Sequence, residues 1–264
     1  MKTLFLKLSK AAMLLATMLL ISCDNQLNDK GEYVIKPNKL SEEVRIKYNN
    51  KGNIDYIQEY ADGIPSGLFM NFKRGNLKDI STIKDDKNNG CGVVFHSNGM
   101  LNNFGQYING NKTGWFYVFD KEGNLSNKRE YVSLNGKEYL NQWVDYASDG
   151  SIDRLSSNYI KVSPVKDTIK MDEEYKLNIS LEAAYFKQFM VLITGPFDEN
   201  FALPKGAKCD TIKSVNFAAT YKTKNYKKGA NILRGMVLDL QPDAKDPKKI
   251  STRKIYFSHD FRVK

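Results

Sequence analysis

The sequence predicts an all-β chain in which an array of antiparallel β-hairpin repeats is followed by a β-sandwich domain. Three observations support this prediction: a glycine-centred pattern recurs at nearly constant spacing, apolar and polar residues alternate between the turns, and no long helical pattern occurs. The chain has 264 residues, of which 41% are hydrophobic, so it can bury a real core. A disordered, collagen-like or low-complexity chain is therefore excluded.

The first segment has the composition of a secretory signal peptide. Lys2, Lys7 and Lys10 precede an apolar run over residues 11–21. This run is shorter than the ~20 residues that a membrane-spanning helix needs. The order of positive charge, apolar run and small residue is typical of an export signal. We therefore expect residues 1–22 to be a signal peptide.

The end of this segment, Leu20-Ile21-Ser22-Cys23, resembles the lipobox of bacterial lipoproteins. The resemblance implies that Cys23 is acylated, with palmitate among its acyl chains, and becomes the first mature residue. Two or more chains give a stable anchor, so we expect a lipoprotein held on a membrane of the bacterial cell envelope, facing the periplasm or exposed on the surface. The alternative is an ordinary signal peptide that contains a cysteine. Residues 23–43 are mostly polar and predict a tether.

A repeat follows over residues 44–154. In each copy a glycine is followed two positions later by Ile or Leu, and five such glycines lie 23, 24, 24 and 27 residues apart: Gly52, Gly75, Gly99, Gly123 and Gly150. Regular self-similarity of this kind is the signature of a repeat architecture. Each copy has the pattern of a hairpin, with glycine supplying the positive φ of a tight turn. We expect positive φ at Gly99 and Gly123.

Alternation along the strands predicts two different faces. One is uniformly apolar and carries Leu68, Met70 and Phe72, then Cys91, Val93 and Phe95, then Trp115, Tyr117 and Phe119. The other is mixed and carries Phe69, Asn71, Gly92, Val94, Phe116 and Val118. We expect the first face to be buried. We expect the second to be exposed, with Phe69 and Phe116 as aromatic anchors for a protein partner. The alternative is that these two rings pack under the β-sandwich domain.

The segment from Tyr107 to Leu125 (YINGNKTGWFYVFDKEGNL) resembles the MORN repeat in its bacterial variant form, and residues 62–69 (DGIPSGLF) follow the same pattern. This variant occurs in bacterial proteins labelled antitoxins of the YwqK type. The resemblance implies a meandering antiparallel sheet with a binding or scaffolding role. It implies no catalytic residues.

After the repeats, residues 155–264 contain short β-rich runs separated by loops. In the first, Tyr175, Leu177, Ile179 and Leu181 alternate with polar residues; the other runs are residues 189–193, 232–240 and 255–263. Several short strands at irregular spacing predict a β-sandwich of immunoglobulin-like type.

The residues that usually carry chemistry are scarce. His96 and His259 are the only histidines, and no Gly-x-Ser-x-Gly nucleophile motif occurs. The run from Asp145 to Gly150 has the outline of a calcium loop, but Ala147 stands where an oxygen ligand is needed. We expect no enzyme activity, no metal and no cofactor. Cys91 and Cys209 could form a disulfide in an oxidising envelope, although the place of Cys91 in the repeat favours a small buried apolar residue.

The formal net charge is +10, and the lysines are spread along the chain. For an exported protein we expect no nucleic-acid partner. The leading hypothesis is a non-enzymatic envelope lipoprotein that acts as a protein-binding or scaffolding module, with an antitoxin or immunity role as its narrower form. The alternative is a surface lipoprotein that binds glycans or anionic lipid headgroups. A hydrolase is disfavoured, and the oligomeric state stays open.

Overall fold

The computed structural model describes residues 23–27, 32–37, 42–246 and 248–264, and the proposed signal peptide lies outside them. It confirms the prediction of an all-β chain, since these ranges hold nineteen strands and no helix. The chain divides into two compact units, Met1–Gly110 and Asn111–Lys264. This division falls inside the repeat array, whereas the repeat pattern itself ends near residue 154.

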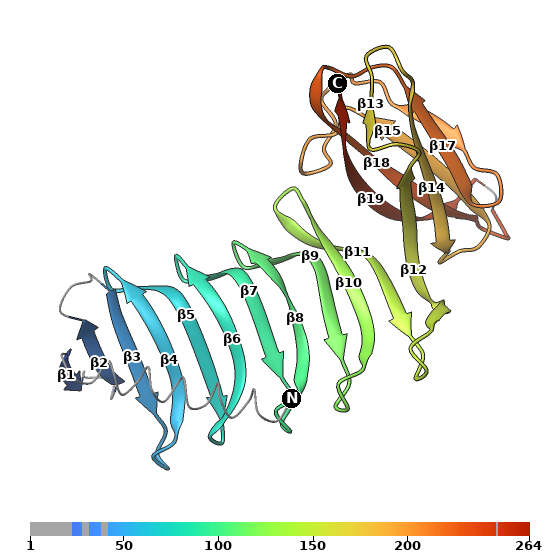
Figure 1. Cartoon of the computed structure of the whole chain (residues 1–264). Helices are drawn as coiled ribbons and strands as arrows, with labels where there is room; N and C mark the ends of the chain where they lie inside the picture. Colours follow the sequence, from blue (N-terminus) through green and yellow to red (C-terminus); the bar gives the residue numbers. More distant parts are fainter. Residues whose placement is uncertain (1–22, 28–31, 38–41, 247) are drawn as a thin grey trace. The chain divides into compact units, whose positions relative to one another are not determined.

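Unit 1 is an antiparallel meander in which each strand pairs with the next (Figure 1). Its strands are β1 (Cys23–Leu27), β2 (Glu32–Pro37), β3 (Glu42–Tyr48), β4 (Ile54–Ala61), β5 (Ile64–Lys73), β6 (Asn76–Lys84), β7 (Lys87–Phe95) and β8 (Leu101–Ile108). The segment expected as a tether, residues 23–43, thus contains β1, β2 and the start of β3. From β5 onward, turns of unit 1 lie at Gly75 and Gly99, where the glycine pattern predicts them.

The positive φ expected at the repeat glycines is confirmed, with 82° at Gly99 and 92° at Gly123. Tight two-residue turns join β4 to β5 at Asp62-Gly63 and β8 to the next unit at Asn109-Gly110, again with positive φ at both positions. Asn, Asp and Gly are the residues that adopt this left-handed conformation most easily.

The prediction of which face is buried was wrong. On the face expected to be buried, Leu68 and Cys91 are exposed. On the face expected to be exposed, Gly92 and Phe116 are buried. The alternation itself is correct, but a hydrophobic face is not automatically the better-covered face when a sheet has no second layer stacked on it.

In unit 1 the reason is a pair of glycines. Gly92 lies directly opposite Gly105 in the β7–β8 ladder. Neither has a side chain, and the ring of Tyr107 covers the space: its Cε2 atom would lie 2.6 Å from a Cβ atom added at Gly92. An aromatic ring over a strand glycine restores the packing that the glycine lacks.

The apolar residues of the opposite face form one cross-strand row. Successive registers align Ile46, Ile57, Met70, Ile80, Val93 and Phe104 over β3 to β8. All six are half-buried. Cross-strand apolar neighbours of this kind stabilise a sheet by a few tenths of a kcal/mol to ~1 kcal/mol per pair, so the row contributes to the stability of unit 1. We name these six residues the apolar row.

Unit 2 holds the last repeats and the C-terminal strands. Its strands are β9 (Asn111–Phe119), β10 (Leu125–Leu134), β11 (Lys137–Tyr146), β12 (Ile152–Pro164), β13 (Thr168–Ile169), β14 (Tyr175–Ala183), β15 (Phe189–Gly195), β16 (Asp210–Lys213), β17 (Ala218–Thr223), β18 (Gly229–Pro242) and β19 (Ile250–Val263). β9 to β12 pair in sequence order, followed by β14 and β17. A second sheet has the order β13-β19-β18-β15-β16, with β13 parallel to β19.

The hydrophobic core lies in unit 2 and takes residues from both sheets. The predicted alternation in β14 is confirmed, since Tyr175, Leu177, Ile179 and Leu181 are all buried. They share one cluster with buried residues of β12, β15, β17, β18 and β19, which include Ile255. Burying a large apolar side chain contributes ~1.5–3 kcal/mol, so this cluster supplies most of the apolar burial in the described residues.

Candidate functional site

The three residues proposed from the sequence for lipid attachment and partner binding lie in different environments. Cys23 is the first residue of β1. Phe69 is half-buried, and its ring lies 6.0 Å from that of Tyr56. Phe116 is only 4% exposed, because the edge of the Tyr131 ring packs on it at 5.4 Å. Phe116 therefore presents no ring to a partner, and its proposed role as an exposed anchor is corrected.

Cys91 and Cys209 are both free thiols, and Cys91 is exposed instead of buried. The ring of His96 bonds the amide of Asn102, with 3.0 Å between Nδ1 and Nδ2. His259 stacks beside the buried Tyr175 ring. Among the described residues, no group of three or more His, Cys, Asp or Glu side chains is placed to hold a metal ion.

The longer hairpin tips of the repeats share a five-residue geometry, closed by a backbone hydrogen bond between the first and fifth residues. In the tip between β3 and β4, the carboxamide oxygen of Asn49 accepts hydrogen bonds from the backbone of Lys51 and Asn53. In the tip between β9 and β10, Asp120 does the same for Glu122 and Asn124. These bonds lower the pKa of Asp120, with the Asn124 backbone N–H as the largest cause. An Asn or Asp at this position therefore stabilises the turn.

The tip between β5 and β6 is the exception. It is a two-residue turn, Arg74-Gly75, in which Lys73 pairs with Asn76. Both turn residues have positive φ, 57° at Arg74 and 81° at Gly75. The left-handed conformation costs a residue with a Cβ atom ~1–2 kcal/mol. Asn and Asp recover part of this cost through hydrogen bonds from their short side chains to the nearby backbone, and arginine does not. The stability of the turn therefore does not explain why an arginine is present.

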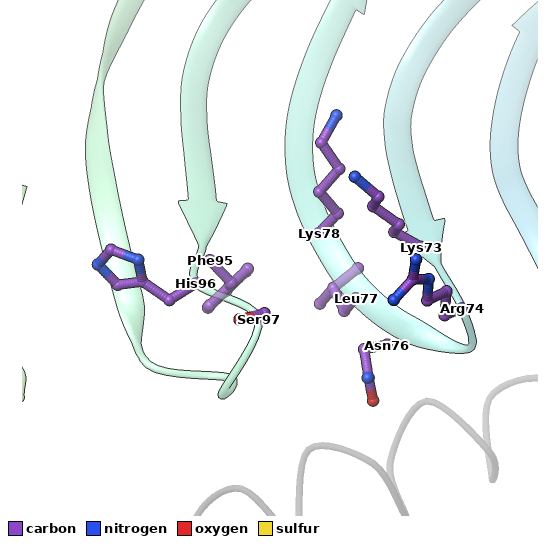
Figure 2. A pocket seen from close by; sticks show the side chains of 8 residues that line it. All are labelled: Lys73, Arg74, Asn76, Leu77, Lys78, Phe95, His96 and Ser97. Atoms are coloured by element: carbon purple, nitrogen blue, oxygen red, sulfur yellow. The ribbon is translucent and has the colours of Figure 1, made fainter. Parts of the chain in front are cut away.

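A groove with a volume of about 540 Å³ lies beside this short tip, between it and the β7–β8 tip. Figure 2 shows Leu77 and Phe95 between the two hairpins, with the side chains of Lys73 and Lys78 extending on the same side. The rest of the lining is Arg74, Asn76, His96 and Ser97. Three cations, several hydrogen-bonding groups and a small apolar floor thus surround one recess.

The charges of this groove are only partly balanced. Lys78 contacts Asp79, with 3.4 Å between Nζ and Oδ2. Within the described residues, neither Lys73 nor Arg74 has a carboxylate at ion-pair distance. An anion in the groove can therefore contact Lys73 and Arg74 without breaking an existing ion pair. Opposite charges at ~4 Å attract with about 4 kcal/mol at the effective dielectric constant of a protein surface.

A second groove, of about 660 Å³, lies on the other side of the same tip. Its lining includes Lys47, Lys51, Asn53 and Asp55 and again includes Arg74. Arg74 is thus common to both grooves. We name Lys47, Lys51, Lys73, Arg74 and Lys78 the basic edge.

The group of five cations that forms the basic edge is not repeated at the other turns of the repeats, although Lys121 lies in the β9–β10 tip and Lys84 and Lys87 flank the β6–β7 turn. On the opposite edge of unit 1, the turns carry Asp62, Asp85 and Asp86. The tips of unit 2 that correspond to the basic edge carry Asp120 and Asp149 as turn residues, and Asp149 bonds the backbone N–H and the hydroxyl of Ser151. The repeat pattern therefore does not require cations at its tips. The sequence alone shows only that lysines are spread along the chain, so it does not predict this edge.

Unit 2 contains a buried polar network that has a structural explanation. Glu130 of β10 accepts hydrogen bonds from Asn141 at 2.6 Å and from Gln142 at 2.7 Å. Asn141 also pairs with both backbone groups of Tyr256 in β19, and Gln142 accepts from the backbone N–H of Ile160 in β12. Burial raises the pKa of Glu130, and the two amide bonds oppose that shift. The network joins the last repeat strands to both C-terminal sheets.

A charged pair, with Asp239 buried and Arg253 half-buried, lies next to this network. Asp239 of β18 is opposite Arg253 of β19 and accepts hydrogen bonds from the backbone of Tyr185 and Phe186. Arg253 donates to the backbone oxygens of Leu140 and Asn141 in β11. Because both charged groups are used to hold loops and strands together, we assign them to the architecture and not to a ligand site.

Comparison with known proteins adds no assignment. Neither a protein-family model nor a curated protein matches the chain. One solved structure that it resembles is a mutant of S. aureus TarM crystallised with fondaparinux, α-GlcNAc-glycerol and UDP, at 12% sequence identity and a TM-score of 0.24. The likeness covers 50% of this chain and 24% of that one. A TM-score this low supports no conclusion about fold or function.

Nowhere in the described ranges is there a helix with the length and hydropathy that a membrane span requires.

Proposed function

We propose that this protein is a non-enzymatic, lipid-anchored protein of the bacterial cell envelope that binds anionic ligands through the basic edge of unit 1. The observation that carries the binding role is Arg74, which occupies a strained turn position where Asn or Asp would be favoured and which lines two grooves. Residues held in costly backbone conformations cluster at functional sites. The lipobox-like end of the signal segment supports the anchor at Cys23.

Binding can be tested on the full chain in detergent micelles. The probes are inorganic phosphate, a galacturonate oligomer and phosphatidylglycerol incorporated into the micelles, each compared at low and high salt. The triple variant Lys73→Gln, Arg74→Asn, Lys78→Gln should lose the interaction. A charge-matched control, Lys222→Gln, Lys224→Asn, Lys227→Gln, changes exposed lysines of unit 2 and should keep it. Equal loss in both variants, or no binding of any probe by the native chain, would contradict the proposed site.

The anchor has a separate test. Cys23→Ser should abolish acylation and move the protein to the soluble fraction or leave its signal peptide uncleaved. A processed variant that still sediments with membranes in high salt would show that Cys23 is not the anchor.

A second function, protein binding or scaffolding, is supported by the half-exposed apolar row. Its six aligned side chains form a continuous apolar strip on a sheet face, which a partner sheet or loop could cover. The resemblance to MORN-variant repeats extends this proposal to an antitoxin-like role. Crosslinking in native membranes should capture a defined partner, and Ile80→Gln should remove that partner while leaving the anion interaction unchanged.

For residues 155–264 we propose an immunoglobulin-like sandwich. Support comes from two sheets that contribute to one core and from the predominantly antiparallel pairing of their strands.

A further inference from the structure

We propose that the ligand of the basic edge is an acidic polysaccharide that runs across successive hairpin tips and occupies both grooves at once, with Arg74 as the shared contact. This inference rests on the proposed binding function and adds the class of ligand and its direction. It follows from the spacing of the grooves, from their lining and from the position of Arg74.

Spacing favours an extended, repeating ligand. Neighbouring strands lie ~4.8 Å apart, so neighbouring hairpin tips recur every ~10 Å. The two grooves lie on either side of the β5–β6 tip, and each contributes its own cations: Lys73 and Lys78 in the first, Lys47 and Lys51 in the second. A chain that lies perpendicular to the strands can therefore place one acidic group in each groove. A single small anion can use only one.

The turn between the two grooves is shorter than its neighbours. Backbone hydrogen bonds close the tips on either side of it between Asn49 and Asn53 and between His96 and Met100. The tip between them has only Arg74 and Gly75 as its turn residues. Arg74 lines both grooves, so a ligand that passes from one groove to the other meets its side chain.

The lining favours a sugar chain over a membrane surface. Besides cations, the first groove offers the amide of Asn76, the hydroxyl of Ser97 and the apolar surfaces of Leu77 and Phe95. The second groove offers Asn50, Asn53 and the ring of Tyr48, and its lining contains one carboxylate, Asp55, against three cations. Sugars combine hydroxyl groups with apolar ring faces, so recessed sites with this mixture suit them. A lipid headgroup surface is flat and is satisfied by protruding lysines alone.

The test uses galacturonate oligomers of increasing length and the full chain in detergent micelles. We expect affinity to rise at least tenfold once an oligomer is long enough to enter both grooves, because the second contact is then intramolecular. Hydrogen bonds to charged groups contribute ~1.5–3 kcal/mol, which corresponds to about a tenfold or larger change in affinity. Three single changes should each lower the affinity for the long oligomer about tenfold: Lys78→Gln in the first groove, Lys51→Gln in the second, and Arg74→Asn between them.

The matched control is Lys224→Asn, which removes the same charge from an exposed loop of unit 2 and should have no effect. Equal affinities for short and long oligomers, or a long-oligomer affinity unchanged by Lys51→Gln, would overturn the two-groove path and leave the binding function intact. Tighter binding to phosphatidylglycerol incorporated into the micelles than to any oligomer would overturn the sugar class. Failure to bind every anionic probe would overturn both proposals together.

Discussion

Arg74 occupies the same left-handed backbone conformation in the β5–β6 turn, at a φ of 57°, that Asp62 occupies in the β4–β5 turn, at 51°. Each is followed by a glycine with positive φ, so the two turns are alike in geometry and differ in the side chain that they present. Asp tolerates this conformation because its carboxylate can bond nearby backbone groups. Arg74 lacks that compensation.

The first prediction concerns the stability of this turn. Arg74→Asn should raise the free energy of unfolding by ~1 kcal/mol, because Asn is favoured in the left-handed region. Urea denaturation followed by circular dichroism measures the change. Asp62→Asn exchanges two residues that both tolerate this conformation and should be nearly neutral. If Arg74→Asn destabilises the protein, the guanidinium has a structural role that the proposed site does not include.

The second prediction concerns the glycine covered by Tyr107. Gly92→Ala should destabilise unit 1 by ~1–3 kcal/mol, the usual cost of overpacking, because the added Cβ would lie 2.6 Å from the tyrosine ring. In a Tyr107→Ala background the same change should cost much less. A double-mutant cycle measures the coupling, and strictly additive effects would mean that the ring does not cover Gly92.

The third prediction separates the two phenylalanines that looked equivalent in the sequence. Phe116→Ala should cost roughly 3–5 kcal/mol, the range for a buried phenylalanine, because Phe116 is 4% exposed. Phe69 is half-buried, so Phe69→Ala should cost clearly less. Thermal or urea unfolding compares them, and an equal cost would contradict the difference in burial.

The fourth prediction concerns pH. Burial raises the pKa of Glu130 above its usual 4.5, so the folded protein holds this proton more tightly than the unfolded chain. The stability of the native protein relative to Glu130→Gln should therefore fall as pH rises from about the unfolded pKa through the raised folded value, and should be constant below that window. Unfolding both proteins across this range measures the difference. A difference that is independent of pH would show that Glu130 is not perturbed.

The fifth prediction is that Asp120 makes stability depend on pH in the opposite direction to Glu130. Its pKa is lowered from 3.8 by the turn hydrogen bonds. The native protein should therefore be more stable than Asp120→Asn at neutral pH, and this advantage should disappear as pH falls from the unfolded pKa through the lowered one.

The sequence was sufficient for the hairpins and their turns, because both depend on local signals. Gly99 and Gly123 mark positions where only positive φ closes the tip, and alternation in β14 places Tyr175 and Leu177 on the buried side. The face assignment in the array failed for a non-local reason. It depends on Gly92 meeting Gly105 and on the ring of Tyr107 filling the space, which requires the register of two strands.

The basic edge was missed for the same kind of reason. Lys47 and Lys51 are separated along the chain from Lys73, Arg74 and Lys78, and each group resembles an ordinary soluble surface. Folding places neighbouring hairpin tips side by side, and only this arrangement gathers the cations on one edge of the sheet. The signal that was available is Arg74 itself, a long cationic side chain at the first position of a two-residue turn.

The 13-residue strand β12, Ile152–Pro164, is shared by neighbours of two kinds. Its first part pairs with β11 of the repeats, and from Tyr159 onward it pairs with β14 of the C-terminal region. A cut at the end of the repeat pattern, near residue 154, would therefore divide one strand between two fragments and leave each with an unpaired edge. Such fragments should aggregate when expressed separately. Dissection of this protein into working parts will have to keep β12 whole.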